Sequence, residues 1–441
     1  MNRRKILLPL LLAAVLLLSG CAMRTVEMMY EVPKRSEAYA KLQSAIDGAM
    51  AGLEYSAPTS GENQQTVQMA DLNGDGVSEY LVFTKGSTEN PLHILIFRQV
   101  GEEYELMTTI ESRGSAFERV EYVDIDDQPG LEIVVGRRVS EQVQGAVSVY
   151  SFAGEEEARL LLSTGYSKFL TCDLDSDSRN ELMVLNSGES SADNGVAVLY
   201  SFQAGAMERS AEVDLSEPAD CIRRIMVSRL HAGIPAVYVA SSADESAIVT
   251  DVFAMKDGVF TNVSFSNESG TSVQTLRNYY VYADDIDDDG ILELPSLITM
   301  HTLTAARSDE AQYLIRWFAM DLEGGEVDKL YSFHNFQGGW YLELDSQWAD
   351  HVSVEQTENG YRFYVWNKTY SLATEVVRIY TLTGNDREEQ AQKDGRFLVC
   401  RSEGVVYAAK ITEEAARYGI NEDSLISAFH LIQKDWKTGE T

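Results

Sequence analysis

The chain is poor in the residues and motifs on which most local catalytic and metal sites depend. Its 441 residues include four cysteines and six histidines. They form neither a Cys-x-x-Cys pair nor a His-Glu-x-x-His motif, which argues against a zinc site. Nucleophile elbows of the form Gly-x-Ser-x-Gly and phosphate-binding Gly-x-x-x-x-Gly-Lys loops are missing as well. We therefore expect no enzyme of these classes, although catalytic groups from distant positions can still meet in a folded protein.

Basic residues are also scarce. The sequence has 36 Lys and Arg against 69 Asp and Glu, a net charge of −33 at pH 7. Without the first twenty residues, which hold three basic and no acidic side chains, the charge becomes −36 (33 − 69). Such a field repels nucleic acid and favours cations or basic partners. Hydrophobic residues make up 44%, enough for a sizeable core, so wholesale disorder is excluded.

Residues 1–20 have the pattern of an export signal. A basic start at 2–5 precedes an apolar run, Ile6 to Leu18, which is shorter than the roughly 20 residues that span a membrane. The run ends in Leu18-Ser19-Gly20-Cys21, which resembles the lipobox of bacterial lipoproteins. The resemblance implies cleavage before Cys21 and lipid attachment to it. Two or more acyl chains would anchor the protein stably to the outer face of the cytoplasmic membrane or to the cell envelope.

Residues 21–35 are expected to be a tether and residues 36–54 a helix. In the helix, Leu42, Ile46, Met50 and Leu53 recur at steps of four, four and three. This stripe predicts packing on the body of the protein, with a coiled-coil partner as the alternative. Cys172, Cys221 and Cys400 are an odd set that leaves at least one free thiol, and a bridge between the first two is an open alternative.

Four acidic segments superpose without gaps from residue 71 onward. They start 53, 49 and 112 residues apart, and the last interval, twice 56, predicts a hidden copy near residue 229. There the segment Arg229 to Val237 keeps the frame without its acids. The four segments are DLNGDGVSE (71–79), DIDDQPGLE (124–132), DLDSDSRNE (173–181) and DIDDDGILE (285–293).

A second series of segments repeats in step with the first. Six apolar strands are countable: Leu92 to Phe97, Val147 to Phe152, Val196 to Phe202, Val249 to Phe253, Tyr313 to Phe318 and Val376 to Leu382. A period of about 50 residues with four strands per unit is typical of a β-propeller, whereas a β-solenoid has shorter coils. We predict an all-β chain with a propeller of six four-stranded blades over residues 64–411. A seventh blade has room between Gln337 and Asp394.

The acidic segments have the oxygen-rich pattern of calcium loops. Positions 1, 3 and 5 offer side-chain oxygens, position 7 a backbone carbonyl, and position 9 a carboxylate, which suits the six to eight oxygen ligands of Ca²⁺. An EF-hand is excluded because position 12 is Val82, Val135, Val184 or Ser296 and the flanks are strand-like. Asp and Asn are common in plain tight turns, but four copies in one frame favour calcium. The pattern resembles FG-GAP/VCBS-type repeats of integrin-α-like propellers from about Thr66 to Ser332, which implies structural Ca²⁺.

The copies differ in quality. The first and fifth match best because a glycine stands at position 6, the third has Ser178 there, and the second has Pro129, whose fixed φ opposes a left-handed turn. The predicted ligands are Asp71, Asn73, Asp75, Val77 and Glu79; Asp173, Asp175, Asp177, Arg179 and Glu181; Asp285, Asp287, Asp289, Ile291 and Glu293; and, ranked last, Asp124, Asp126, Gln128, Gly130 and Glu132.

All five tryptophans lie after residue 310. Trp340, Tyr341 and Trp348 are candidates for a ligand-binding rim, with burial in a blade core as the alternative. Strands are expected at Phe397 to Cys400 and Val405 to Lys410, one of them a candidate to close the ring. Residues 412–441 are predicted to form helices capped by Thr412 and Asn421. The second helix would present Leu425, Phe429, Ile432 and Trp436 on one face.

These features together predict a lipid-anchored, calcium-stabilised propeller outside the cytoplasmic membrane, which binds or scaffolds an unidentified protein or glycan. The first alternative is an extracytoplasmic enzyme acting on glycans, with carboxylates in a central funnel. The second is an envelope assembly factor that recruits its partner through the helix at residues 36–54.

Overall fold

The protein is described by a computed structural model that covers residues 37–140, 144–152, 156–188, 193–278, 281–301, 303 and 313–432. The signal segment, Cys21, the tether, Trp436 and the side chain of Trp348 lie outside the described residues. Within that range, no helix is both long and apolar enough to cross a membrane. The described chain divides into an N-terminal unit (37–57, 65–70 and 78–113) and a second unit (58–64, 71–77 and 114 onward).

The N-terminal unit is one antiparallel sheet with a helix on it. The helix is α2 (Glu37–Ala49), and the strands are β1 (Glu54–Tyr55), β2 (Val67–Ala70), β3 (Glu79–Lys85), β4 (Leu92–Val100) and β5 (Glu103–Ser112). Leu42 and Ile46 are buried against the sheet, so the expected packing of the helix is confirmed within this unit. The helix ends before the predicted residue 54 because Gly52 takes a left-handed φ of 78° in the turn that follows.

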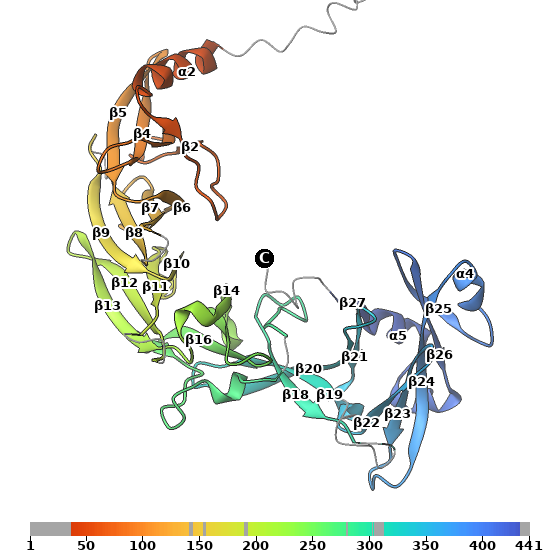
Figure 1. The fold of residues 1–441 in the computed structure, drawn as a ribbon. Coiled ribbons are helices and arrows are strands. Elements are labelled where there is room, and N and C mark those ends of the chain that lie inside the picture. The colour runs from red at the N-terminus through yellow and green to blue at the C-terminus, as the bar shows by residue number, and fades with distance from the viewer. Residues whose placement is uncertain are drawn as a thin grey trace, which may run out of the picture. The chain divides into compact units, whose positions relative to one another are not determined.

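The second unit contains five further antiparallel sheets in chain order (Figure 1). The second and third sheets hold β6 (Ala116–Val123), β7 (Glu132–Arg138), β8 (Gly145–Ser151) and β9 (Arg159–Tyr166), then β10 (Lys168–Cys172), β11 (Glu181–Asn186), β12 (Val196–Gln203) and β13 (Ala206–Asp214). The fourth holds β14 (Ile222–Arg229), β15 (Pro235–Ser242), β16 (Ile248–Lys256) and β17 (Val259–Asn262). The fifth holds β18 (Leu294–Thr299), β19 (Tyr313–Met320), β20 (Glu326–Asn335), β21 (Trp340–Leu344) and β27 (Phe429–Leu431). The sixth holds β22 (Val352–Thr357), β23 (Gly360–Trp366), β24 (Ala373–Thr383), β26 (Val405–Ile411) and β25 (Phe397–Ser402).

Six sheets built on four-stranded antiparallel meanders are what a six-bladed propeller requires, so the predicted fold class is confirmed. Each of the six apolar segments counted in the sequence lies in a different sheet. The hidden copy is also present, since residues 229–237 connect β14 to β15 through the short 3₁₀ helix η3 (His231–Gly233). No seventh sheet forms in the described part of the chain, because the stretch from Gln337 to Asp394 supplies strands to the fifth and sixth sheets.

The core of the second unit lies between successive sheets. In β11, Leu182 and Val184 pack toward the second sheet, while Met183 and Leu185 pack toward the fourth. Alternate side chains of a strand point to opposite faces, so a strand buried on both faces must be apolar throughout. This explains why the inner strands have unbroken apolar runs rather than the alternation of a half-exposed sheet.

The C-terminal segment corrects part of the predicted helix. Asn421 caps α5 (Glu422–Ala428) with a full capping box, as expected. The helix then stops, and Phe429–Leu431 pairs with β21 as β27. Phe429 and Ile432 therefore do not share a helix face with Leu425, because the open edge of β21 offers backbone hydrogen bonds that a short helix end cannot match.

The remaining C-terminal elements are short. Thr412 precedes the 3₁₀ helix η6 (Glu413–Tyr418) without a side-chain cap bond, and β25 and β26 extend the sixth sheet beside β24. The other helical turns are α3 (Ser346–Ala349), α4 (Arg387–Gln390), η2 (Ala219–Cys221) and η4 (Val273–Thr275).

Candidate metal centres in the acidic loops

The acidic loops occupy equivalent places in their sheets. Three of them connect β2 to β3, β6 to β7 and β10 to β11, and the fifth copy leads into β18 behind a bridge between Asp284 and Glu293. Position 2 is an apolar residue that is buried in every copy: Leu72, Ile125, Leu174 and Ile286. This buried side chain anchors the start of each loop and leaves the acids around it to form the turn.

The glutamate at position 9 is buried in each copy, and in the second, third and fifth copies it closes the loop. Oε2 of Glu132, Glu181 and Glu293 accepts a hydrogen bond from the backbone N of position 2, at 2.8, 2.9 and 3.1 Å. Burial raises the pKa of each of these three carboxyls to about 7. The position predicted as a metal ligand therefore also serves as a clamp across the loop. Glu79 is likewise buried, at the start of β3 in the N-terminal unit.

Left-handed residues at positions 4 and 6 give the first, third and fifth loops their common shape. These are Gly74 and Gly76, Ser176 and Ser178, and Asp288 and Gly290. In the second copy Pro129 cannot take this conformation, and the left-handed residue after Asp127 is instead Gly130, with φ 108°. Pro129 therefore gives the second loop a different backbone path from the other three.

Three loops gather acidic side chains closely enough to hold a metal ion. Within each group, one ligand oxygen per residue lies within 4.8 Å of the others: Asp124, Asp126 and Glu132; Asp173, Asp175 and Glu181; Asp285, Asp287 and Asp289. Hard carboxylate oxygens fit Ca²⁺. In the fifth loop, Oε1 of Glu293 is buried without a hydrogen bond, so this oxygen needs a cation nearby. When bound, calcium would supply positive charge and structural cross-linking to these acids.

The third copy borders a cavity. Asp175, Asp177 and Glu181 line a space of about 380 Å³ whose other walls include Leu199, Met255 and Phe260. Among the described residues, Arg179 alone lines it with a basic side chain, which pairs with Asp177 and lowers the pKa of that carboxyl. By contrast, burial and the Asp177 charge raise the pKa of Asp175. The third loop thus combines a candidate ion site with room for a second ligand beside it.

The second copy uses one of its acids internally. Asp126 is buried, accepts a hydrogen bond from Ser151 Oγ at 3.0 Å and lies 3.6 Å from Arg159 Nη2. The side chain of Gln128 donates to the carbonyl of Asp127. The carboxylate of Asp126 therefore already has a hydroxyl and a guanidinium of the protein as partners.

The first copy forms the expected turn. Asp71 accepts hydrogen bonds from the backbone N of Gly74 and Gly76, at 2.7 and 2.9 Å, and the N of Val77 donates to Asp75. Asn73 in turn accepts from the N of Asp75. The first copy is not among the three-acid groups of the described residues.

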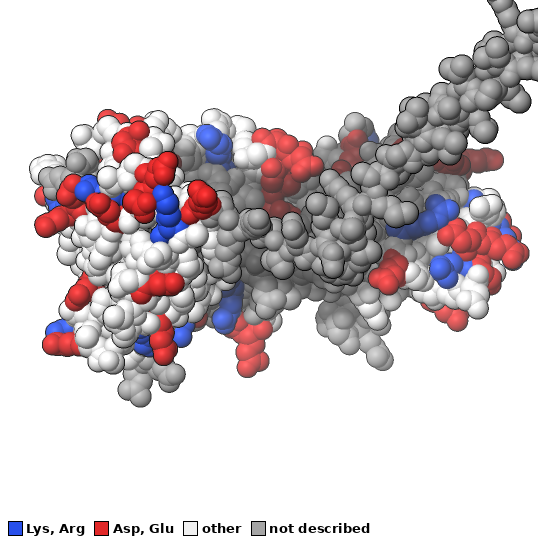
Figure 2. Space-filling model, turned by 90° about the horizontal axis from the view of Figure 1, so that it is seen from above, with Lys and Arg blue, Asp and Glu red and all other residues white. Residues whose placement is uncertain are grey.

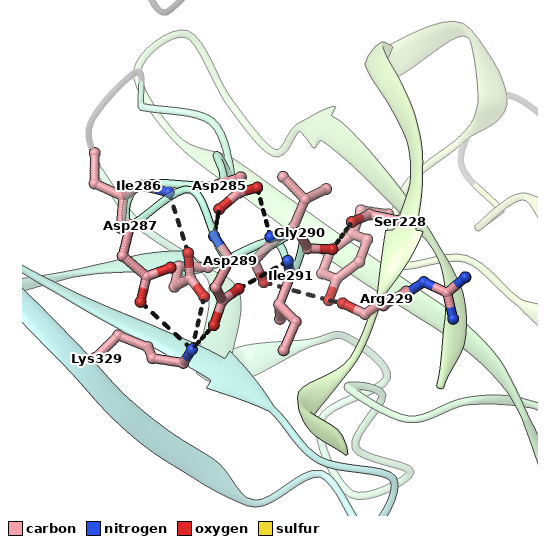
Figure 3. A network of polar contacts seen from close by, with 12 residues as sticks. Ser228, Arg229, Asp285, Ile286, Asp287, Asp289, Gly290, Ile291 and Lys329 are labelled. Atoms are coloured by element: carbon pink, nitrogen blue, oxygen red, sulfur yellow. Dashed lines mark hydrogen bonds and ion pairs between the residues drawn. The ribbon is translucent and has the colours of Figure 1, made fainter. Parts of the chain in front are cut away.

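In the fifth copy a lysine reaches into the loop from another strand (Figure 3). The ammonium of Lys329, on β20, contacts Asp287, Asp289 and Glu293. No local sequence pattern indicates this contact, because residue 329 lies 36 positions beyond the end of the acidic segment.

Backbone hydrogen bonds join the first loop to the second and the second to the third. The N of position 8 donates to the carbonyl of position 1 in the preceding copy, from Leu131 to Asp71 at 3.0 Å and from Asn180 to Asp124 at 2.7 Å. Gly130 approaches closely enough that an added Cβ would lie 2.4 Å from the carbonyl oxygen of Leu72. The loops are therefore in direct contact with one another through their backbones.

The fourth sheet, whose loop at residues 229–237 has no acids, contains a buried polar network elsewhere. Asp251, on β16, accepts hydrogen bonds from Ser216 N and Oγ, Asn262 Nδ2 and Ser272 Oγ, at 2.6 to 2.9 Å. Nearby Arg277 is fully buried and donates to the carbonyls of Thr275 and Val281. One signal was available in the sequence: Asp251 is a charged residue inside an apolar strand.

Trp340 lies in the core rather than at a rim, because Phe333, Tyr361 and Phe429 pack against its ring. Tyr341 is stacked between His334 and His430, and it lines a space of about 570 Å³ beside the fifth loop. Cys172, Cys221 and Cys400 are free thiols, so the alternative of a bridge between the first two is not realised.

No protein-family model matches the chain, and neither does any curated protein. Among solved structures, a protein from Lactobacillus plantarum is 10% identical over 72% of this chain and 85% of its own, with a TM-score of 0.27. Saccharomyces cerevisiae Sqt1 is 12% identical over 75% and 92%, with a TM-score of 0.29. The exotype rhamnogalacturonan lyase YesX is 11% identical over 81% and 72%, with a TM-score of 0.26. At these scores the similarities carry no conclusion about function.

Proposed function

We propose that the protein is a lipid-anchored, extracytoplasmic β-propeller that binds calcium and presents a ligand-binding surface, acting as a binding or scaffold module rather than as an enzyme. The third acidic loop is the observation that carries this proposal. Its acids Asp173, Asp175 and Glu181 lie together, and the loop lines the cavity described above. Calcium held there would be close to a protein or glycan ligand that enters the cavity.

The charge of the molecule supports a cation-binding role. The net charge is −33, and Figure 2 shows clusters of acidic side chains with fewer basic ones on the face it presents. A bound divalent ion lowers the repulsion among such acids. In the family that the loops resemble, calcium has this structural role.

Calcium should raise the thermal stability of the wild-type protein through the third loop. A site with a Kd of about 0.1 mM adds about 1.4 kcal/mol to the free energy of unfolding at about 1 mM Ca²⁺. We expect Asp175→Asn to remove this increment, as measured by calorimetry in 1 mM calcium and in chelator. Glu268→Gln is the matched control, since Glu268 is an exposed acid outside the loops. A melting temperature of the wild type that is equal in calcium and chelator would contradict calcium binding.

Membrane anchoring is expected to depend on Cys21. In a bacterial host, wild-type protein should incorporate labelled palmitate and fractionate with membranes, whereas Cys21→Ala should lose the label and the membrane association. Two acyl chains give stable binding where one is marginal, so the change should be nearly complete. Cys400→Ala serves as the control for loss of a different thiol. Labelling that persists in Cys21→Ala would exclude the proposed anchor.

A further inference from the structure

The fifth loop contains a cation that the chain itself provides. Lys329 lies in β20, and its Nζ is 3.4 Å from Asp287 Oδ2, 3.7 Å from Glu293 Oε1 and in direct contact with Asp289 Oδ2 (Figure 3). The lysine side chain is only 16% exposed. Its ammonium therefore sits at the point toward which three carboxylates converge.

The carboxylates need positive charge at this point. The side chain of Glu293 is fully buried, and its Oε1 accepts no hydrogen bond, so the lysine 3.7 Å away supplies the compensating charge. The same contacts raise the pKa of Lys329 and lower that of Asp289, in each case chiefly through the hydrogen bond between the two side chains. Without the ammonium, several acids would repel one another around a buried carboxylate.

The basic residues that pair with the other acidic loops are placed differently. In the third loop, Arg179 belongs to the loop and pairs with Asp177 at its exposed side. In the second loop, Arg159 lies 3.6 Å from Asp126 alone. Among the ion pairs of the described residues, only Lys329 brings an ammonium from a separate strand to three acids of one loop.

We propose that Lys329 is the resident cation of the fifth loop and takes the place of a calcium ion there. An ammonium and a divalent ion cannot share the same few oxygens, because their charges repel strongly at such short distances. The fifth loop is then stable without calcium. This inference rests on the proposed function only in assuming that an acidic loop of this kind, freed of its lysine, can bind calcium.

Lys329→Met tests the inference, since methionine has an unbranched side chain of similar size and removes the charge. We expect the variant to bind one calcium ion more per chain than the wild type in equilibrium dialysis, with a Kd of about 0.1 to 1 mM. Adding Asp289→Asn should abolish the extra ion. In chelator the single variant should melt at a lower temperature than the wild type, and calcium should restore most of the difference. Lys256→Met, which removes an exposed partner of Glu323, should change neither result.

The possible outcomes separate this inference from the proposed function. If the wild type binds no ion and Lys329→Met binds one, the lysine has the inferred role and calcium binding by the wild type fails. If Asp289→Asn alone removes an ion from the wild type, the fifth loop already holds calcium and the inference is overturned. It is also overturned if Lys329→Met gains no ion. Should Lys329→Met not fold, Lys329→Gln prepared in calcium is subject to the same criteria.

Discussion

Replacing Asp251 by alanine should destabilise the protein by about 3 to 5 kcal/mol. The carboxylate is fully buried and accepts four hydrogen bonds, so its loss leaves donors from Ser216, Asn262 and Ser272 without their acceptor. A cavity adds to this cost. Urea unfolding followed by circular dichroism measures the change.

Asp251→Asn should fall between the wild type and Asp251→Ala. Asparagine keeps the shape and one acceptor oxygen, but its amide would face the backbone N of Ser216, where a donor meets a donor. Glu268→Ala, an exposed acid on the segment that follows β17, should be nearly neutral. If Asp251→Ala lowers the free energy of unfolding by less than about 1 kcal/mol, the network does not stabilise the fourth sheet.

The Asp251 network joins three segments around the fourth sheet. In the fourth sheet, the connection from Arg229 to Val237 has no acids that could bind an ion or cap a turn. Asp251 instead binds the end of β17, through Asn262, to the segments around Ser216 and Ser272. A buried carboxylate with hydroxyl and amide donors therefore joins segments that are distant in the sequence.

Gly130→Ala should cost about 3 kcal/mol or more. Gly130 has a φ of 108°, which L side chains rarely adopt, and the new Cβ would lie 2.4 Å from the carbonyl oxygen of Leu72. The clash is with backbone, so it can be relieved only by moving one loop away from the next. Calorimetry should show a lower melting temperature in calcium and in chelator alike.

Gly76→Ala is the matched control for Gly130→Ala. Gly76 also has a positive φ, 84°, but an added Cβ would have no atom within 4 Å. Gly76→Ala should lower the free energy of unfolding by about 1 to 2 kcal/mol, through the strain of the left-handed backbone alone. Equal effects of the two substitutions would show that close contact between the loops is unimportant and that backbone strain explains both.

The sequence predicted strands better than it predicted the chain's end. The repeated spacing placed one apolar segment in each of the six sheets, because each of these strands is specified by its own apolar side chains and bounded by turns. Phe429 failed as a helix residue because its partner strand, β21, lies almost ninety positions earlier. Burial of Trp340 likewise depends on β20 and β27 on either side, which no local pattern encodes.

By itself, the sequence determined the number of sheets and the position of each acidic loop, since both follow from a repeat whose residues act locally. Only the tertiary structure decided which groups compensate the negative charge of each loop. Lys329 and Arg159 reach acids from other strands, and Asp251 is held by donors up to 35 positions away. Charge compensation acts through space, so residues distant in the chain determine which loops have carboxylates left for an ion.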